Sequence, residues 1–348
     1  MILSAASSIY GVAATWRRRW YARDPERRRH LAQPVVSVGN LCAGGSGKTP
    51  AVAHIARLLL AHGERPVILT RGYARRLQTD GVTVVSDGSK ILAGVENAGD
   101  EPLMLARTLP GVPVLVGADR YLSGRMAEQR FAATVHLLDD GFQHLALARD
   151  VDLLLVCEGD LTDRLLPSGR LREPLDVASA ADALLVTVGY ESAAGRIGRA
   201  LGVPTTFRIS REIGAPRMIA TGETVVVPNG DPVFAVAGIA RPEGFFTDVE
   251  GAGWRIAGTL AFRDHHPFGQ RDVERITALA KSVAAAIVLT TEKDAMRLAA
   301  CDLKGLPIAA VPLTACIEPA GLFQHWLFER LQVRRTSNPE PGTGNQPE

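Results

Sequence analysis

A glycine-rich segment between an apolar run and a helical pattern constrains the fold of this chain more than any other feature. The apolar run ends at Val38, and residues 39–50 read Gly-Asn-Leu-Cys-Ala-Gly-Gly-Ser-Gly-Lys-Thr-Pro. A strand, a glycine-rich loop and a helix in this order form a phosphate-binding loop (P-loop), because the backbone N–H groups of the loop face phosphate oxygens. The sequence therefore predicts an α/β protein that binds a nucleoside triphosphate.

The residues of this loop have separate expected roles. Four of them would form the cradle for the phosphates: Gly44, Gly45, Ser46 and Gly47. Lys48 would reach the β- and γ-oxygens, and Thr49 could hold Mg²⁺. Cys42 stands where the strict pattern has its first glycine. The alternative is a turn that merely joins a strand to a helix, but Gly-Lys-Thr at a helix N-terminus has little packing purpose.

The composition fits a globular protein with two domains. The chain has 348 residues, of which 46% are hydrophobic and 22% are charged, and its formal net charge is +2. This small charge argues against a dedicated nucleic-acid binder. The four cysteines are far apart and have no metal-type spacing, so we expect reduced thiols in a cytosolic compartment.

The first 30 residues combine an apolar segment with a basic one. Residues 1–16 are apolar but shorter than the roughly 20 residues that a spanning helix needs. Tyr10, Trp16 and Trp20 lie near the end of this segment, and seven arginines follow between residues 17 and 29. We expect residues 1–30 to form an interfacial membrane anchor, with the arginines on lipid phosphates. The alternative is an ordinary first helix with a solvated basic face.

Short apolar runs alternate with helical patterns through residues 31–212, which we expect to form the P-loop domain. The predicted strands are Val35–Val38, Pro66–Thr70, Val112–Val116, Thr134–Leu138, Val151–Val156 and Ala183–Val188. The predicted helices are Pro50–His62, Pro102–Thr108, Arg120–Phe131 and Ser192–Leu201. Nearly continuous apolar strands between helices predict a mostly parallel sheet that is covered on both faces.

A second, smaller α/β domain is expected at residues 233–333, after a linker at 213–232. Glycine and proline are frequent in the linker, which would contain a strand or hairpin. The predicted strands of the smaller domain are Val233–Ala237, Arg255–Phe262, Ala286–Thr290 and Ile308–Pro312, and its predicted helices are Pro242–Val249, Arg271–Val283 and Gly321–Gln332. Residues 334–348 are polar, and we expect them to be disordered.

Polar residues follow the predicted strand that ends at Leu138. Asp139 and Asp140 come directly after it and would offer carboxylates to Mg²⁺ or its water shell, as a P-loop requires. The alternative is a solvated turn. Gln143 and His144 follow in the same turn and could bind a substrate or cap the turn.

Other polar groups suit proton transfer or phosphate binding. Asp264 precedes His265 and His266, and a histidine oriented by a carboxylate can transfer protons, although a structural polar loop is equally consistent. Arg71 follows a predicted strand, and Arg172 lies in a loop, where arginine suits phosphate but is often merely solvated. Asp100 lies near a predicted helix start, and its spacing alone favours helix capping.

Together these segments resemble the tetraacyldisaccharide 4′-kinase family, the lipid A 4′-kinases of Gram-negative bacteria. The resemblance rests on motifs that recur in order to about residue 330: Val38-Gly39-Asn40, Gly44–Pro50, Arg71-Gly72-Tyr73, Gly99-Asp100-Glu101-Pro102, Asp139-Asp140-Gly141-Phe142-Gln143-His144, Leu171-Arg172-Glu173-Pro174, Asp264-His265-His266 and Thr291-Glu292-Lys293-Asp294. The Asp-Asp-Gly-Phe-Gln-His block is highly specific. The apolar start followed by arginines also resembles the membrane-associated N-terminus of the family.

The resemblance implies transfer of the ATP γ-phosphoryl group to the 4′-hydroxyl of a tetraacylated glucosamine disaccharide 1-phosphate, which gives lipid IVA. It implies a P-loop domain, a smaller α/β domain and a site between them, at the cytoplasmic face of the inner membrane. The cofactors would be ATP and Mg²⁺. The expected partners are the lipid acceptor and the membrane surface, with no nucleic acid; protein partners are not specified.

The resemblance also assigns roles to residues. Asp100 would act as the base, paired with His265 rather than His266, which replaces the capping role favoured by spacing. Lys48 and Arg172 would neutralise charge, and Mg²⁺ would bind Thr49 with Asp139 or Asp140. The expected substrate-binding residues are Arg71, Glu101, Gln143, His144 and Glu173.

Three other functions compete with this one. A membrane-associated switch ATPase of the MinD/ParA kind would carry a signature lysine where this chain has Ala43. A GTPase is disfavoured because the guanine-reading motif has one more residue between Lys293 and Asp294. A non-catalytic membrane scaffold would keep the P-loop for stability and would consume no ATP.

Overall fold

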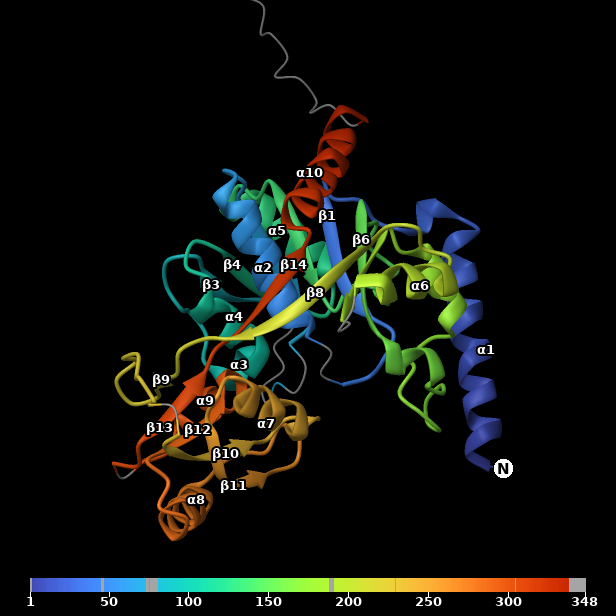
Figure 1. Cartoon of the computed structure of the whole chain (residues 1–348). Helices are drawn as coiled ribbons and strands as arrows, with labels where there is room; N and C mark the ends of the chain where they lie inside the picture. Colours follow the sequence, from blue (N-terminus) through green and yellow to red (C-terminus); the bar gives the residue numbers. More distant parts are fainter. Residues whose placement is uncertain are drawn as a thin grey trace, which may run out of the picture.

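The computed structural model describes residues 2–44, 47–72, 75, 81–187, 191–228, 230–303 and 305–337. Within these residues the strands form a nine-stranded sheet and a five-stranded sheet, which lie in two lobes of different size (Figure 1). The larger sheet is mostly parallel, with an antiparallel strand at each edge. This confirms the predicted α/β fold class, with a P-loop sheet and a smaller α/β unit.

The larger sheet contains the strand that precedes the P-loop. Its strands are β1 (Val35–Asn40), β2 (Pro66–Thr70), β3 (Val82–Asp87), β4 (Pro113–Gly117), β5 (Val135–Asp139), β6 (Val151–Cys157), β7 (Ala183–Thr187), β8 (Thr206–Ile213) and β14 (Leu313–Glu318). Their order across the sheet is β14-β8-β7-β6-β1-β5-β2-β4-β3. β1 pairs in parallel with β5, and Val38 lies opposite Asp139. The carboxyl ends of these two strands therefore meet at the edge where the P-loop begins.

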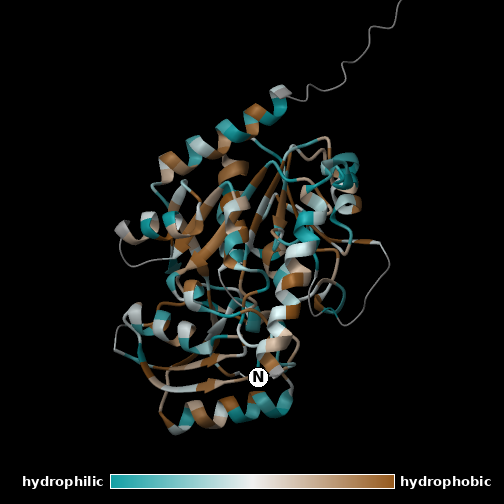
Figure 2. Cartoon of the chain, turned by 90° about the vertical axis from the view of Figure 1, so that its right-hand side faces the viewer, coloured by the Kyte–Doolittle hydropathy of each residue, from teal (hydrophilic) through white to brown (hydrophobic). Residues whose placement is uncertain are grey.

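Helices cover both faces of this sheet. The helices of the larger lobe are α1 (Ile2–Ala22), α2 (Lys48–Ala61), α3 (Val95–Ala98), α4 (Asp100–Thr108), α5 (Arg120–Phe131), α6 (Glu191–Leu201) and α10 (Ala320–Ser337). Alternate residues of β2 face different clusters: Ile68 packs with α2, α4 and α10, whereas Val67 and Leu69 pack with α5. Strands buried on both faces are mostly apolar, and Figure 2 shows them largely brown between helices of mixed colour.

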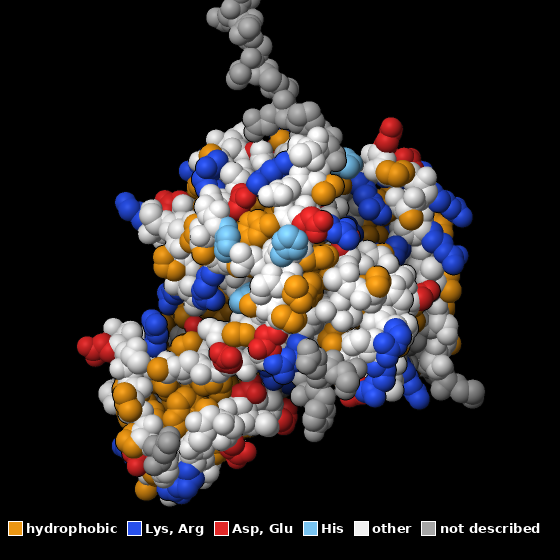
Figure 3. All heavy atoms as spheres, turned by 45° about the horizontal axis from the view of Figure 1, so that its top comes forward, with side chains coloured by type: hydrophobic (Ala, Val, Ile, Leu, Met, Phe, Trp, Pro, Cys, Tyr) orange, Lys and Arg blue, Asp and Glu red, His pale blue; other side chains and the backbone are white. Residues whose placement is uncertain are grey.

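The smaller lobe is a second α/β unit. Its elements are β9 (Arg217–Met218), β10 (Pro232–Ala237), α7 (Pro242–Gly251), β11 (Arg255–Ala261), α8 (Gln270–Ser282), β12 (Ile287–Thr291), α9 (Glu292–Leu298) and β13 (Ile308–Val311). Three short 3₁₀ helices, Pro25–Arg27, Glu158–Thr162 and Leu175–Ala180, lie in connections of the larger lobe. Figure 3 shows the smaller lobe projecting from the larger one, with acidic and basic side chains near their junction.

The end of the chain departs from the expected domain division. Residues 313–333 were expected in the smaller domain, but β14 pairs antiparallel with β8, and α10 packs on the larger sheet. Phe323 and Leu327 of α10 share a buried cluster with Ile55 of α2. Residues 334–337 continue α10 instead of starting a disordered tail, and residues 338–348 lie outside the described residues. The chain thus crosses between the lobes twice.

α1 lies along the outside of the larger lobe (Figure 1). It is attached through polar contacts: the Ser7 hydroxyl donates to the Leu165 carbonyl over 3.0 Å, and the Arg18 guanidinium pairs with Glu173 over 2.8 Å. Several of its apolar side chains face away from the lobe, including Ile9, which is 72% exposed. Within the described residues, no helix has the length and apolar character that crossing a membrane requires.

Candidate active site

The P-loop joins β1 to α2 as the sequence predicts. Gly44 and Gly47 have φ angles of 101° and 81°, which favour glycine, and Gly47 is the N-cap of α2. Lys48 and Thr49 then occupy the first turn of the helix, where the free N–H groups point outward from its end. Gly45 and Ser46 lie outside the described residues. The arrangement suits the binding of a phosphate chain.

Lys48 lies next to the acidic end of β5. Its Nζ donates to the Asn40 Oδ1 over 2.9 Å and is 3.7 Å from the Asp140 Oδ1. The turn that follows β5 lies close to the end of β1 because residue 39 is glycine. A Cβ at Gly39 would lie 2.5 Å from the Phe142 Cβ. The P-loop lysine and the adjacent aspartates therefore belong to one site, as the sequence predicts.

The two aspartates differ in their electrostatics. Asp139 is buried, and its burial together with the negative charges of Glu101 and Asp140 raises its pKa to about 7. Burial also acts to raise the pKa of Asp140, but hydrogen bonds from Arg172 and the charge of Lys48 outweigh it and hold that pKa below its usual range. A buried carboxylate beside a second one, with the Thr49 hydroxyl in the first turn of α2, is a donor set that suits Mg²⁺.

Arg172 and its neighbours connect this centre to α1. The Arg172 guanidinium donates to both Asp140 oxygens over 2.8 Å and also contacts the Asn40 carbonyl and side chain. The Gln143 Nε2 donates to the Asn40 carbonyl over 2.9 Å and to Glu173 over 3.3 Å, and Glu173 accepts from Arg18 of α1. Asn40 thus organises residues that the sequence analysis named separately, although it had not named Asn40 as a site residue.

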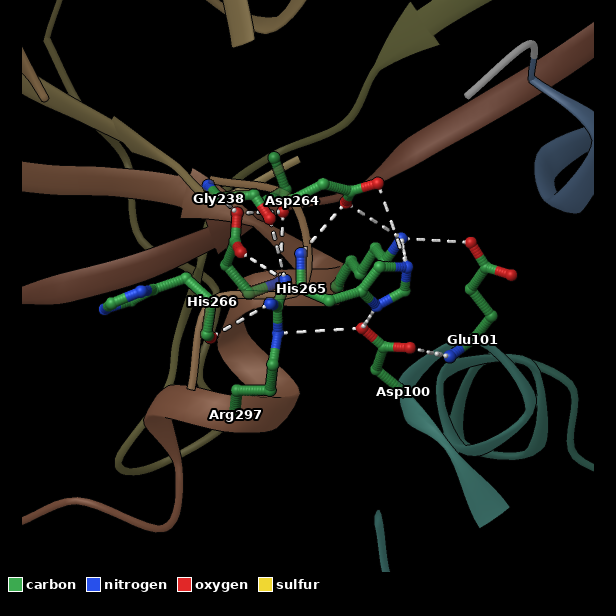
Figure 4. Close-up of polar contacts among 10 residues, drawn as sticks. Asp100, Glu101, Gly238, Asp264, His265, His266 and Arg297 are labelled. Atoms are coloured by element: carbon green, nitrogen blue, oxygen red, sulfur yellow. Dashed lines mark hydrogen bonds and ion pairs between the residues drawn. The ribbon is translucent and has the colours of Figure 1, made fainter. Parts of the chain in front are cut away.

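Asp100 and His265 come from different lobes and meet (Figure 4). The His265 Nδ1 lies 3.1 Å from the Asp100 Oδ2, and the other oxygen of Asp100 accepts from the Glu101 N–H over 3.0 Å. His266 instead pairs with Asp272 over 3.0 Å and stacks on Phe262. The geometry therefore brings His265, and not His266, to Asp100. Asp100 is the first residue of α4, but the N-cap of this helix is Gly99, so Asp100 is not the capping residue that its spacing favoured.

The environment of Asp100 keeps it ionised. Its carboxylate is 4% exposed, and burial alone would raise its pKa. The hydrogen bond with His265 and the positive charges of Lys293 and Arg297 outweigh burial, and the pKa of Asp100 falls below its usual range. Arg297 approaches with its Nε 3.6 Å from the Asp100 Oδ2.

The sequence analysis did not name Lys293 or Arg297 as site residues. Both lie on α9, and the Lys293 Nζ lies 3.1 Å from the Glu101 Oε1 of the larger lobe. The Arg297 guanidinium donates to the Gly238 and His266 carbonyls and to Asp294. The available signal for Lys293 was the Thr-Glu-Lys-Asp segment at the end of an apolar strand, which served as a motif of the family resemblance and was compared with a guanine-reading motif, but was given no role in the site.

The remaining predicted residues lie around Arg120, which the sequence analysis also missed. Arg71 is exposed at the end of β2, and Arg120 is 5% exposed at the start of α5. Burial and the nearby charge of Arg71 lower the pKa of Arg120 to about 10. Burial and the charges of Arg120 and Arg149 lower the pKa of His144 to about 4. Two arginines that repel each other beside a neutral histidine could receive an anionic group.

Comparisons with known proteins identify the family. The family model described as "Tetraacyldisaccharide-1-P 4'-kinase" matches residues 1–332. A tetraacyldisaccharide 4′-kinase from Geobacter sulfurreducens is 37% identical over 316 residues, covering 90% of this chain and 88% of that protein. One from Desulfotalea psychrophila is 41% identical over 301 residues, covering 84% and 86%.

A solved structure agrees with these relatives. The crystal structure of an "apo" form of LpxK from Aquifex aeolicus in complex with ATP matches with a TM-score of 0.76 and 31% sequence identity. The match covers 95% of this chain and all of that one. The chain therefore belongs to the tetraacyldisaccharide-1-P 4′-kinase family.

Proposed function

We propose that this protein transfers the γ-phosphoryl group of ATP to the 4′-hydroxyl of a tetraacylated glucosamine disaccharide 1-phosphate, the step that gives lipid IVA in lipid A synthesis. Family membership supports an ATP-dependent kinase of this pathway. The observation that carries the residue-level proposal is the meeting of Asp100 with His265 next to the P-loop centre, where the charge of Glu101 acts on Asp139. A switch ATPase has no need of an acid–histidine pair brought together from two lobes.

The P-loop centre would hold and neutralise the triphosphate. The backbone of the loop would face the phosphate oxygens, and Lys48 would turn from Asn40 towards them. The two hydrogen bonds from Arg172 hold Asp140 in a fixed position, and the positive charge of Arg172 stays next to the P-loop centre. When bound between Thr49, Asp139 and Asp140, Mg²⁺ would supply charge stabilisation of the transferring phosphoryl group.

Asp100 would accept the proton of the attacking hydroxyl. A low pKa makes it a weak base in the ground state, but the hydroxyl becomes strongly acidic as its oxygen bonds to phosphorus, so a positioned carboxylate suffices. His265, Arg297 and the Glu101 N–H hold both oxygens of Asp100 in place. Asp100 would thus act mainly through its position.

The acceptor would be bound beside the membrane. Arg71 and Arg120 suit an anionic group of the acceptor, together with neutral His144. α1 would lie at the cytoplasmic surface of the inner membrane with its exposed apolar side chains in the lipid and its arginines near headgroup phosphates. The pair between Arg18 and Glu173 connects this helix to the segment that carries Arg172. A lipid held at the surface would then have its sugar near the phosphate centre.

Phosphate transfer to the defined lipid tests the proposed reaction. Purified protein is incubated with ATP, Mg²⁺ and the tetraacyl disaccharide 1-phosphate, and the lipid is examined for a mass gain of one phosphate. We expect Lys48→Ala to lower the rate of this gain by more than about 100-fold, because it removes a charge that acts on the transferring group. The control is Lys90→Ala, which removes an exposed lysine in a turn.

Two outcomes would contradict the proposal. Retained transfer in Lys48→Ala would exclude the P-loop role. ATP consumption that depends on vesicles alone, without phosphate in the lipid, would instead support the switch ATPase.

A further inference from the structure

Arg18 of α1 faces the larger lobe, whereas its neighbours Arg17 and Arg19 are exposed. Gly11 and Arg18 are seven residues apart, a spacing that places two residues on one face of a helix. This face lies close to the larger lobe, because a Cβ at Gly11 would lie 2.6 Å from the Leu165 Cδ1. The packing of α1 therefore directs Arg18 towards the lobe and its two neighbours away from it.

The Arg18 guanidinium binds Glu173 at two points. Its Nε donates to the Glu173 Oε1 over 3.1 Å, and its Nη2 donates to the Oε2 over 2.8 Å. This geometry fixes the orientation of the carboxylate as well as its position. The side chains of Arg18 and Glu173 are only 12% and 4% exposed. Removal of the arginine would therefore leave a buried carboxylate without its counterion.

Arg18 also contacts the turn that follows β5. Its Nη2 donates to the Phe142 carbonyl over 3.4 Å, and its guanidinium carbon lies 4.5 Å from the centre of the Phe142 ring. The Phe142 side chain is fully buried, so the arginine rests on a fixed surface. Phe142 is the second residue after Asp140. Arg18 thus supports the turn that begins with the aspartates of the P-loop centre.

The two contacts of Arg18 lead to the same centre. Glu173 accepts from the Gln143 Nε2 over 3.3 Å, so the segment at Glu173 and the turn after β5 are also joined to each other. Arg172 directly precedes Glu173 and donates to both oxygens of Asp140. One guanidinium on α1 therefore supports both segments that supply the pair of Arg172 and Asp140.

The face of α1 that we expect in the lipid lies opposite to Arg18. Ile9 and Trp16 lie nine and two residues before Arg18, and at about 100° per residue each is roughly half a turn away around the helix. Both are exposed. A headgroup phosphate could bind the Arg18 guanidinium only by displacing Glu173 from it.

We propose that Arg18 is a positioning residue of the active site and not a headgroup-binding residue of the membrane anchor. It holds Glu173 and the turn at Phe142, and through them the pair of Arg172 and Asp140. The headgroup contacts of this part of α1 then belong to its exposed arginines. The inference rests on the proposed function only in treating the P-loop centre as the active site.

Hydrogen exchange measures this positioning without any turnover. In Arg18→Gln we expect the amide groups of residues 139–144 and 171–173 to exchange at least about threefold faster than in the wild type, because both segments lose the guanidinium. Mass spectrometry of peptic peptides measures these rates. The matched control is Arg19→Gln, which removes the exposed neighbour and should leave exchange in both segments unchanged. Unchanged exchange in Arg18→Gln would overturn the proposal.

Vesicle binding and kinetics should respond to the two arginines in opposite ways. We expect Arg19→Gln to weaken co-sedimentation with anionic vesicles by about fivefold and Arg18→Gln to leave it within about twofold of the wild type. We expect Arg18→Gln to lower kcat for lipid phosphorylation by roughly 10- to 100-fold, as for other residues that orient the groups of a catalytic centre. Arg18→Lys should restore only part of kcat, because an ammonium cannot bind the carboxylate at two points. Weakened vesicle binding at unchanged kcat in Arg18→Gln would overturn the proposal.

A double-variant cycle tests whether Arg18 acts through Glu173. The losses of kcat in Arg18→Gln and Glu173→Gln should combine in the double variant to much less than their product. Losses that multiply would overturn the proposal. Where Arg18→Gln does not fold, Arg18→Lys undergoes the same measurements. If the wild type failed to phosphorylate the defined lipid, the proposed function would fail, but hydrogen exchange and vesicle binding would still decide the role of Arg18.

Discussion

The chemistry of the site depends on a few buried charges, each held by groups from other elements. Arg172 pairs with Asp140, and Asp100 accepts a hydrogen bond from His265 near the charges of Lys293 and Arg297, so that both pKa values are lowered despite burial. Asp139 is the exception, because burial and the negative charges of Glu101 and Asp140 raise its pKa. The site is therefore short of positive charge at Asp139 and well supplied with it at Asp100.

Asp100 gives the first prediction at this scale. Asp100→Asn keeps the shape of the side chain but removes its capacity to accept a proton, so we expect kcat to fall by about 10²- to 10⁴-fold with little change in the KM for the lipid. Steady-state kinetics of lipid phosphorylation measures both constants. The control is Asp302→Asn, at an exposed position of the smaller lobe. A rise in KM at unchanged kcat would make Asp100 a binding residue instead.

His144 gives a prediction about stability. Folding lowers its pKa from the ordinary 6.5 to about 4, so protonation favours the unfolded state. The free energy of unfolding that depends on neutral His144 is fully present above pH 6.5 and is lost as the pH falls from 6.5 towards 4. We expect the free energy of unfolding to fall between pH 7.5 and pH 5 by about 1 kcal/mol more in the wild type than in His144→Asn. Urea denaturation at the two pH values measures this difference, and equal losses would show that His144 is not held neutral.

At the scale of the elements, the sequence predicted the strands and helices that have a recognisable pattern in their own residues. Strands such as Val151–Cys157 are mostly apolar because both faces are buried, and the helix Arg120–Phe131 was predicted with the bounds that the structure has. α9 was missed because its seven residues follow β12 directly and are too few to show a helical period. Its Thr291 N-cap was the available local sign.

Contacts between distant segments explain the other differences. Cys316 of β14 lies opposite Ser210 of β8, and no local pattern shows which of two sheets a strand will join. Likewise, Lys293 and Glu101 are 192 residues apart, so their pairing follows only from the way the two lobes meet. The phosphate-binding half of the site could be predicted because the P-loop and the adjacent strand each carry a motif.

α1 is the element that gives a prediction about membranes. Ile9, Val12 and Trp16 are 72%, 72% and 66% exposed on a helix that is attached to the lobe by a hydrogen bond from Ser7 and an ion pair of Arg18. We expect replacement of all three by Gln to weaken co-sedimentation with anionic vesicles by at least about tenfold, because the apolar area that enters the lipid is lost. The control is Leu322→Gln, which changes an exposed leucine of α10.

Salt separates the two contributions to this binding. The attraction of the arginines to lipid phosphates should weaken between 0.05 and about 0.5 M salt, whereas the apolar contribution should not. Unchanged sedimentation of the triple variant would contradict the anchoring role of this helix face.

At the scale of the whole molecule, the two lobes approach each other at the P-loop as well as at Asp100. A Cβ at Gly44 would lie 3.9 Å from the Cβ of Ala240 in the smaller lobe. Arg211 of β8 lies beside Gly47 and pairs over 3.5 Å with Asp248 of α7. The nucleotide-binding loop therefore lies close to the smaller lobe, and we expect the position of that lobe to affect the use of ATP.

Reversal of this ion pair tests the connection. Arg211 is 41% exposed, and pairs of this kind contribute about 0.2–1 kcal/mol, so we expect Asp248→Lys to lower kcat/KM for ATP by about two- to fivefold. The double variant with Arg211→Asp should recover most of this loss, because the opposite charges are restored. Lipid phosphorylation at varied ATP concentration measures both effects.

The control reverses Arg208 and Glu318, a pair within the larger sheet, which should leave the KM for ATP unchanged. If Asp248→Lys alone had no effect, the pair would not contribute to ATP use; a double variant worse than the single would instead indicate that Arg211 acts on the nucleotide itself.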